Sequence, residues 1–149
     1  MNIKLELFKE CVKFVNNRAQ TVEDIISSNQ KALQTETKSS AGDKHETGRA
    51  MLQLEMEKAS QQLAGIHQMK AILSKINTNK ISEIAHLGSI IETASVNYFL
   101  AISAGKIIVN DRLYYAVSVS SPIGKLLLGK TVADLLVFNG KEIIINSIK

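Results

Sequence analysis

The sequence is poor in the residues that cross-link or bend a chain. Its 149 residues include one cysteine, one proline and no tryptophan. The single Cys11 excludes an internal disulfide framework and a CxxC metal pair, so we expect a reducing, cytoplasmic environment. No apolar run approaches the ~18–20 residues that cross a bilayer, and a membrane partner is not expected. The first 14 residues carry a charge every few positions, which is not the pattern of a signal peptide.

The charge of the chain is mildly basic and evenly spread. The formal net charge is +4, and 45% of the residues are hydrophobic, which fits a folded chain of one domain or two small ones. Residues 1–76 hold 11 basic and 9 acidic side chains, and the remainder holds 7 and 5. Neither part has the lysine and arginine density of a protein that grips DNA phosphates, so strong direct DNA binding is not expected.

The first half of the chain has the spacing of a helical coiled coil. Apolar residues recur at alternating steps of four and three along two seams separated by the polar stretch KSSAGDKHETG, residues 38–48. The first seam runs through Phe8, Val12, Val15, Ala19, Val22, Ile26, Asn29 and Leu33, and the second through Leu52, Met56, Ala59, Leu63, Ile66, Met69, Leu73 and Ile76. This pattern predicts an antiparallel coiled-coil hairpin over residues 1–76, on the order of 50 Å long, with its tip near 38–48. Asn29 is expected to be a polar residue that sets the register of the two helices.

The second half has a different period. Short β-branched and aromatic runs, such as NYFLAIS and KIIVN, are separated by glycine, asparagine and charge. Asn139-Gly140 between two apolar runs predicts a tight hairpin, and Pro122 to Gly129 predicts a short helix with proline at its start and glycine at its end. The predicted fold class is therefore α+β: the hairpin, a linker at 77–80, and a small antiparallel sheet domain with one short helix at 81–149.

Conventional active sites are absent from the sequence. It contains no glycine-rich phosphate loop, no HExxH and no GxSxG. His45, His67 and His86 are far apart along the chain, and Cys11 lies beside the first seam, where a thiol behaves as a small apolar group. A conventional active site is therefore hard to assemble from these residues.

The informative polar stretch is Gly42-Asp43-Lys44-His45-Glu46, and it has two compatible interpretations. In the first, Asp43 is the N-cap of the second helix and Glu46 completes a capping box. In the second, two carboxylates at the end of a long hairpin are metal ligands carried to a partner. Mg²⁺ commonly takes one or two carboxylates and completes its shell with water and substrate phosphate.

Two segments carry a family resemblance that covers essentially the whole chain. The tip segment SSAGDKHETGRAMLQLEMEKA resembles the tip of the bacterial Gre transcript-cleavage factors, which reads GD-x-x-EN before an acidic helix. Residues 121–148, SPIGKLLLGKTVADLLVFNGKEIIINSI, resemble the end of the GreA/GreB C-terminal domain with its SP-[IL]-G-x-x-L-[IL]-G-K-x-x-G-D pattern. Ala133 departs from that pattern, which usually has glycine there.

The resemblance implies a fold and an activity. It implies a coiled coil followed by an FKBP-like sheet domain that binds core RNA polymerase, with the coiled coil in the secondary channel. It also implies that Asp43 and Glu46, at the two acidic tip positions, hold a Mg²⁺ ion jointly with the polymerase. The polymerase then hydrolyses the backtracked RNA 3′ end, which this protein reaches only through the polymerase. The resemblance therefore implies a protein that is not an enzyme in its own right and has no cofactor of its own. Because no tryptophan is available for an aromatic proline pocket, prolyl isomerase activity is not expected.

The tip departs from the family after Glu46. The family usually continues Asn-Ala-Glu-Tyr, whereas this chain has Thr47-Gly48-Arg49-Ala50. Two alternatives therefore stand beside a cleavage factor. One is a channel-binding regulator or inhibitor that does not stimulate cleavage, and the other is a coiled-coil scaffold for another protein.

Overall fold

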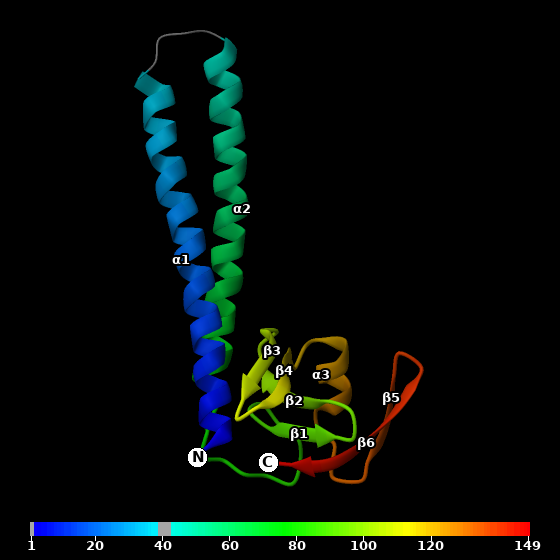
Figure 1. The fold of residues 1–149 in the computed structure, drawn as a ribbon. Coiled ribbons are helices and arrows are strands. Elements are labelled where there is room, and N and C mark those ends of the chain that lie inside the picture. The colour runs from blue at the N-terminus through cyan, green and yellow to red at the C-terminus, as the bar shows by residue number, and fades with distance from the viewer. Residues whose placement is uncertain (1, 39–42) are drawn as a thin grey trace. The chain divides into compact units, whose positions relative to one another are not determined.

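The computed structural model describes residues 2–38 and 43–149, and it describes the side chains of this range except those of 36–46. Two long helices, α1 (Ile3–Lys38) and α2 (Asp43–Ser74), run antiparallel to one another (Figure 1). Six strands and one short helix follow. They are β1 (Ile90–Thr93), β2 (Asn97–Ala101), β3 (Gly105–Val109), β4 (Arg112–Ser118), α3 (Pro122–Leu127), β5 (Leu135–Phe138) and β6 (Lys141–Ile148). The predicted α+β class, with a helical hairpin before a sheet, is confirmed.

Burial along α1 and α2 follows the two predicted seams. Every seam position is buried or half-buried, and Val15, Ala19, Val22, Ala59 and Ile66 are almost fully buried. Most of the described residues of α1 and α2 that lie off the seams have charged or amide side chains and are exposed. Because an isolated helix of this length gains most of its stability from an amphipathic face, the shared seam is what keeps the two helices folded.

Near the start of α1 the buried face is wider than the sequence predicts. Leu7 and Cys11 are completely buried, whereas the predicted seam residues Phe8 and Val12 are half-buried. Residues 1–14 and 70–149 form one compact unit, and residues 15–69 form the other. The start of α1 and the end of α2 therefore belong to the same unit as the sheet. The predicted linker at 77–80 lies between the end of α2 at Ser74 and the start of β1 at Ile90.

The sheet is mixed rather than purely antiparallel. Its strand order is β3-β4-β2-β1-β6-β5. Four of the five pairings are antiparallel, but β2 pairs with β4 in parallel, with Tyr98 opposite Tyr115 and Leu100 opposite Val117. β2 and β4 are parallel because β3 lies at the edge of the sheet and β4 returns between β3 and β2. The predicted sheet, mostly antiparallel with one short helix, is confirmed, and this one pairing is parallel.

Both faces of the central strands are covered. On one face, Ile91, Leu100 and Ile145 pack with Ile123 and Leu127 of α3 in a continuous apolar cluster. On the other, Ile90, Phe99 and Tyr114 are also buried, and the completely buried Leu7 and Cys11 belong to the same compact unit. Because successive side chains along each strand point to opposite faces of the sheet, the core is divided into two layers.

The predicted tight turn is confirmed, and a second one accompanies it. Asn139 and Gly140 have φ of 53° and 77°, so both central residues are left-handed, as a two-residue hairpin loop requires. Asn110 and Asp111 have φ of 54° and 61° between β3 and β4 and make the same kind of turn. Within the described part of the chain, no helix is long and apolar enough to span a membrane.

Asn29 yields a prediction about stability. Its side chain is 7% exposed, and its Nδ2 has no hydrogen-bond partner among the described residues. A buried donor without a partner costs about 1–3 kcal/mol, so Asn29→Leu should raise the free energy of unfolding by an amount in that range. Urea unfolding followed by circular dichroism measures this change. The exposed Asn16→Leu is the control and should change stability by less than about 0.5 kcal/mol. A less stable Asn29→Leu protein would contradict the view that Asn29 Nδ2 is a buried donor without a partner.

Candidate functional site

The acidic pair of the predicted tip lies at the beginning of α2. Asp43 is the first residue of the helix and Glu46 is the fourth, so their backbones are three positions apart within its first turn. Segment 39–42 and the side chains of 36–46 lie outside the described residues, and the capping box and metal-ligand interpretations both fall there. The structure therefore places these two residues by their helical backbone alone.

The residues that follow the pair are described in full. Thr47, Arg49 and Ala50 are exposed and Gly48 is half-buried, all within α2. Arg49 therefore presents a cation to solvent within one turn of Glu46. Among the described side chains, no group of three or more histidine, cysteine, aspartate or glutamate residues could hold a metal ion.

The remaining nucleophile and base candidates have ordinary structural surroundings. Burial, with a smaller contribution from the neighbouring Glu10 carboxylate, raises the pKa of the Cys11 thiol to about 12, so the thiol stays protonated at neutral pH. His67 is exposed on α2. His86 Nδ1 lies 2.9 Å from Ser89 Oγ, which also accepts a hydrogen bond from the His86 backbone N–H at 2.9 Å. This histidine closes a turn before β1.

The Ser-Pro-Ile-Gly motif forms a close corner between β4 and α3. Ser121 is the N-cap of α3: its hydroxyl accepts from the Gly124 N–H at 3.1 Å and donates to the Ser118 carbonyl at 2.6 Å. Pro122 occupies the first helical turn, where its missing N–H costs nothing. A Cβ on Gly124 would overlap the Ser118 carbonyl oxygen, so this position accepts only glycine in this conformation.

The end of the same motif contains a second conformational constraint. Ala133 has φ of 73°, in the left-handed region that glycine adopts without penalty. Its N–H donates to the Ile145 carbonyl at 2.8 Å, and Asp134 Oδ2 accepts from the Thr131 N–H at 2.8 Å, which fixes the turn. A glycine at position 133 would adopt this conformation without the penalty that alanine incurs.

Comparison with known proteins adds no family to these observations. No protein-family model matches the chain, and a search of characterised proteins finds no significant match. The candidate site therefore rests on the sequence motifs and on the placement of Asp43 and Glu46 at the start of α2.

Replacing alanine by glycine should have opposite effects on the free energy of unfolding at positions 133 and 64. Ala133→Gly relieves a left-handed alanine and should raise the free energy of unfolding by about 1 kcal/mol. Ala64→Gly, at an exposed position inside α2, should lower it by about 0.5–1 kcal/mol because glycine loses more backbone entropy in a helix. Thermal and urea unfolding of the two variants measure both effects. A destabilised Ala133→Gly protein would show that the turn is not strained.

Proposed function

We propose that the protein is a Gre-like transcription elongation factor of the cytoplasm. Its sheet domain binds core RNA polymerase, and its helical hairpin enters the secondary channel of that enzyme. One observation carries the proposal: Asp43 and Glu46 lie in the first turn of α2, at the end of a hairpin whose helices have 36 and 32 residues. The Ser121–Gly124 corner supports it, because Ser121 caps α3 and Gly124 leaves no room for a Cβ, and both residues match the Gre-like motif.

The dimensions and surface of the hairpin suit a narrow aqueous passage. At about 1.5 Å per residue, α2 is roughly 48 Å long. Its apolar residues are concentrated on the seam, and most of the side chains on its outer surface are charged or polar. A structure of this kind can be surrounded by water over most of its length and still present its end to a buried active site.

The proposed chemistry is two-metal phosphodiester hydrolysis performed by the polymerase. One metal activates the attacking water and the other stabilises the leaving oxygen. The polymerase supplies the first Mg²⁺, and the Asp43 and Glu46 carboxylates complete the site of the second. The chain therefore acts in trans: alone it is not a nuclease, and it reaches the backtracked RNA 3′ end only inside the complex.

The sheet domain offers an exposed apolar row for docking. Leu135 pairs with Ile144 across β5 and β6, and Val137 lies two residues along the same face of β5. All three side chains are more than half exposed, whereas the intervening Leu136 is buried. A contiguous exposed apolar row of this kind is typical of a protein contact. We propose that it contacts the polymerase.

The second candidate function is a channel-binding regulator without cleavage activity. Its specific support is the exposed Arg49, which stands in the neighbourhood where Gre factors have an acid and an aromatic residue. A cation near the acidic pair weakens its attraction for Mg²⁺. A coiled-coil scaffold for a different protein has no comparable observation in its favour.

The proposed mechanism predicts that removing the negative charge of Asp43 lowers stimulated RNA cleavage. Asp43→Asn replaces an anion with a neutral amide, which is a poor ligand for Mg²⁺, while asparagine can cap a helix about as well as aspartate. Stimulated cleavage of 3′-extruded RNA in a stalled elongation complex should fall about tenfold or more, since a lost metal contact costs several kcal/mol. Helix content and polymerase binding should be unchanged. Asp24→Asn, on the exposed surface of α1, is the matched control and should retain full activity.

The same assay separates the alternatives. Wild-type protein that competes with an authentic Gre factor for the polymerase, without stimulating cleavage, is a channel-binding regulator. Wild-type protein that cleaves as well as its Asp43→Asn variant uses Asp43 as a helix cap alone. Failure to bind core polymerase would overturn the proposal as a whole and favour the scaffold.

The docking proposal has its own prediction. Replacing Leu135 and Val137 together by serine removes apolar area from an exposed surface, so the fold should persist while affinity for core polymerase falls about tenfold or more. The control is Ile108→Ser together with Leu113→Ser, an exposed apolar pair on β3 and β4. Competition binding with labelled wild-type protein compares the two. Equal loss from both pairs would show a nonspecific effect of surface hydrophobicity.

A further inference from the structure

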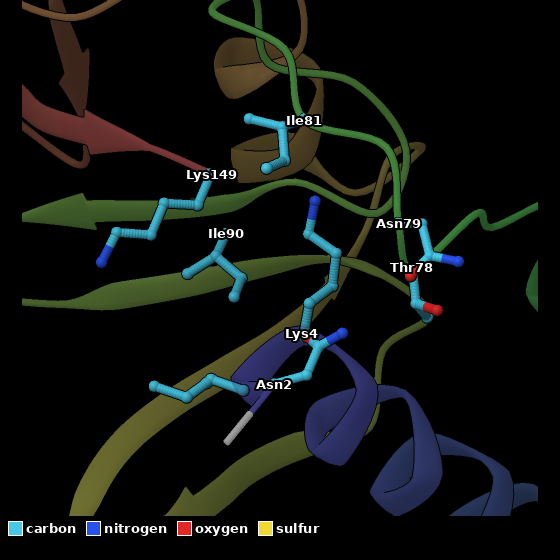
Figure 2. Close-up of a pocket in the computed structure, with 8 residues that line it drawn as sticks. Asn2, Lys4, Thr78, Asn79, Ile81, Ile90 and Lys149 are labelled. Carbon is cyan, nitrogen blue, oxygen red and sulfur yellow. The ribbon is translucent and has the colours of Figure 1, made fainter.

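A cavity of about 370 Å³ lies where the start of α1 meets the segment that leads into the sheet. Figure 2 shows its lining side chains, which come from the start of α1 and the residue before it, from the segment after α2, from β1 and from the residue that follows β6. They are Asn2, Ile3, Lys4, Thr78, Asn79, Ile81, Ile90 and Lys149. All of them belong to the compact unit formed by residues 1–14 and 70–149. The size falls within the range of small-ligand pockets.

Lys4 is the unusual member of this lining. Its side chain is 6% exposed, and its Nζ donates to the Lys80 carbonyl at 2.7 Å. In Figure 2 the side chain extends between Ile90 and the Thr78–Asn79 segment. No carboxylate among the described residues forms an ion pair with Lys4. A buried ammonium whose partner is a neutral carbonyl remains electrostatically uncompensated.

The second lysine of the lining is already paired. Lys149 Nζ donates to Glu92 Oε1 at 3.0 Å, and its side chain points away from Lys4 in Figure 2. Its backbone N–H and C=O are paired with those of Ile90, both at 2.9 Å. Among the described side chains that line the cavity, Lys4 therefore carries the positive charge that has no carboxylate partner.

The start of α1 adds to the positive potential. Asn2 Oδ1 accepts from the Leu5 N–H at 3.2 Å and so caps a helix of 36 residues. The first N–H groups of a helix lack intrahelical partners and carry the positive end of its dipole. Burial lowers the pKa of the Lys4 ammonium, which is the expected response of a cation without a counter-charge.

We propose that this cavity binds an organic carboxylate with a short apolar body, whose acid group pairs with Lys4 Nζ. The amide and hydroxyl groups of Asn2, Thr78 and Asn79 supply further polar contacts, and Ile3, Ile90 and the exposed Ile81 line the apolar part. A single unpaired ammonium with an apolar wall matches a monoanion. A phosphate dianion is typically held by arginine or by several charged donors, which this lining lacks. The site is independent of the proposed action on RNA polymerase.

The test uses hexanoate and hexanol as probes on the full-length protein. Hexanoate should shift the methyl resonances of Ile81 and Ile90 in a saturable way, and it should raise the thermal unfolding midpoint. Hexanol, with the same apolar body and no charge, should bind at least about tenfold more weakly because it cannot compensate the buried ammonium. Equal binding of the two probes, or no binding of hexanoate, would overturn the proposal.

A pair of lysine variants assigns the interaction. Lys4→Met keeps the length of the side chain and removes the charge, and it should lower hexanoate affinity at least about tenfold. Lys80→Met, in the same segment but outside the lining, should bind hexanoate as the wild type does. Unchanged affinity in Lys4→Met would contradict the assignment to Lys4. The wild-type comparison of hexanoate with hexanol decides the proposal even if Lys4→Met does not fold.

Discussion

The narrow apolar seam between α1 and α2 is the interaction on which the rest of this structure depends. Between residues 15 and 69 the fully buried apolar side chains of α1 and α2 all lie on this seam, so each helix is held by the stripe that it shares with the other. Small residues such as Ala19 and Ala59 occupy buried positions, which allows the helices to lie close together. Because one stripe is enough, most of the described side chains on the outer faces of the two helices are polar.

Sequence periodicity predicted the features that depend on local spacing. The helical seams, the change of period near residue 81 and the Asn139–Gly140 turn all follow from interactions between residues close together in the chain. The parallel pairing of β2 with β4 could not be predicted in this way, because it depends on which strand β4 returns beside. The complete burial of Leu7 and Cys11 was missed for a similar reason: long-range packing in the first compact unit adds to the seam.

The candidate sites also differ in whether local spacing in the sequence or long-range packing defines them. Asp43 and Glu46 were found from a short motif, and the structure adds their place in the first turn of α2, while their role in metal binding stays a prediction. Lys4 gave no signal in the sequence, because a lysine in a charged N-terminal segment resembles any solvated lysine. Its burial is visible only when the start of α1 and residues 78–81 are brought together. Ala133 stood out in the sequence because the pattern that the chain resembles has glycine at this position. Its positive φ is a backbone conformation that glycine adopts without strain.

The central claim is that the start of α2 reaches the catalytic metal of RNA polymerase. Replacing the active-site Mg²⁺ of a backtracked elongation complex with Fe²⁺ generates hydroxyl radicals that cut polypeptide within a short distance of the metal. The account predicts that this protein, labelled at one end, is cut around residues 39–46, and that excess Mg²⁺ suppresses the cut. Binding to the complex with no cut in that region, or with cuts confined to the sheet domain, would contradict it.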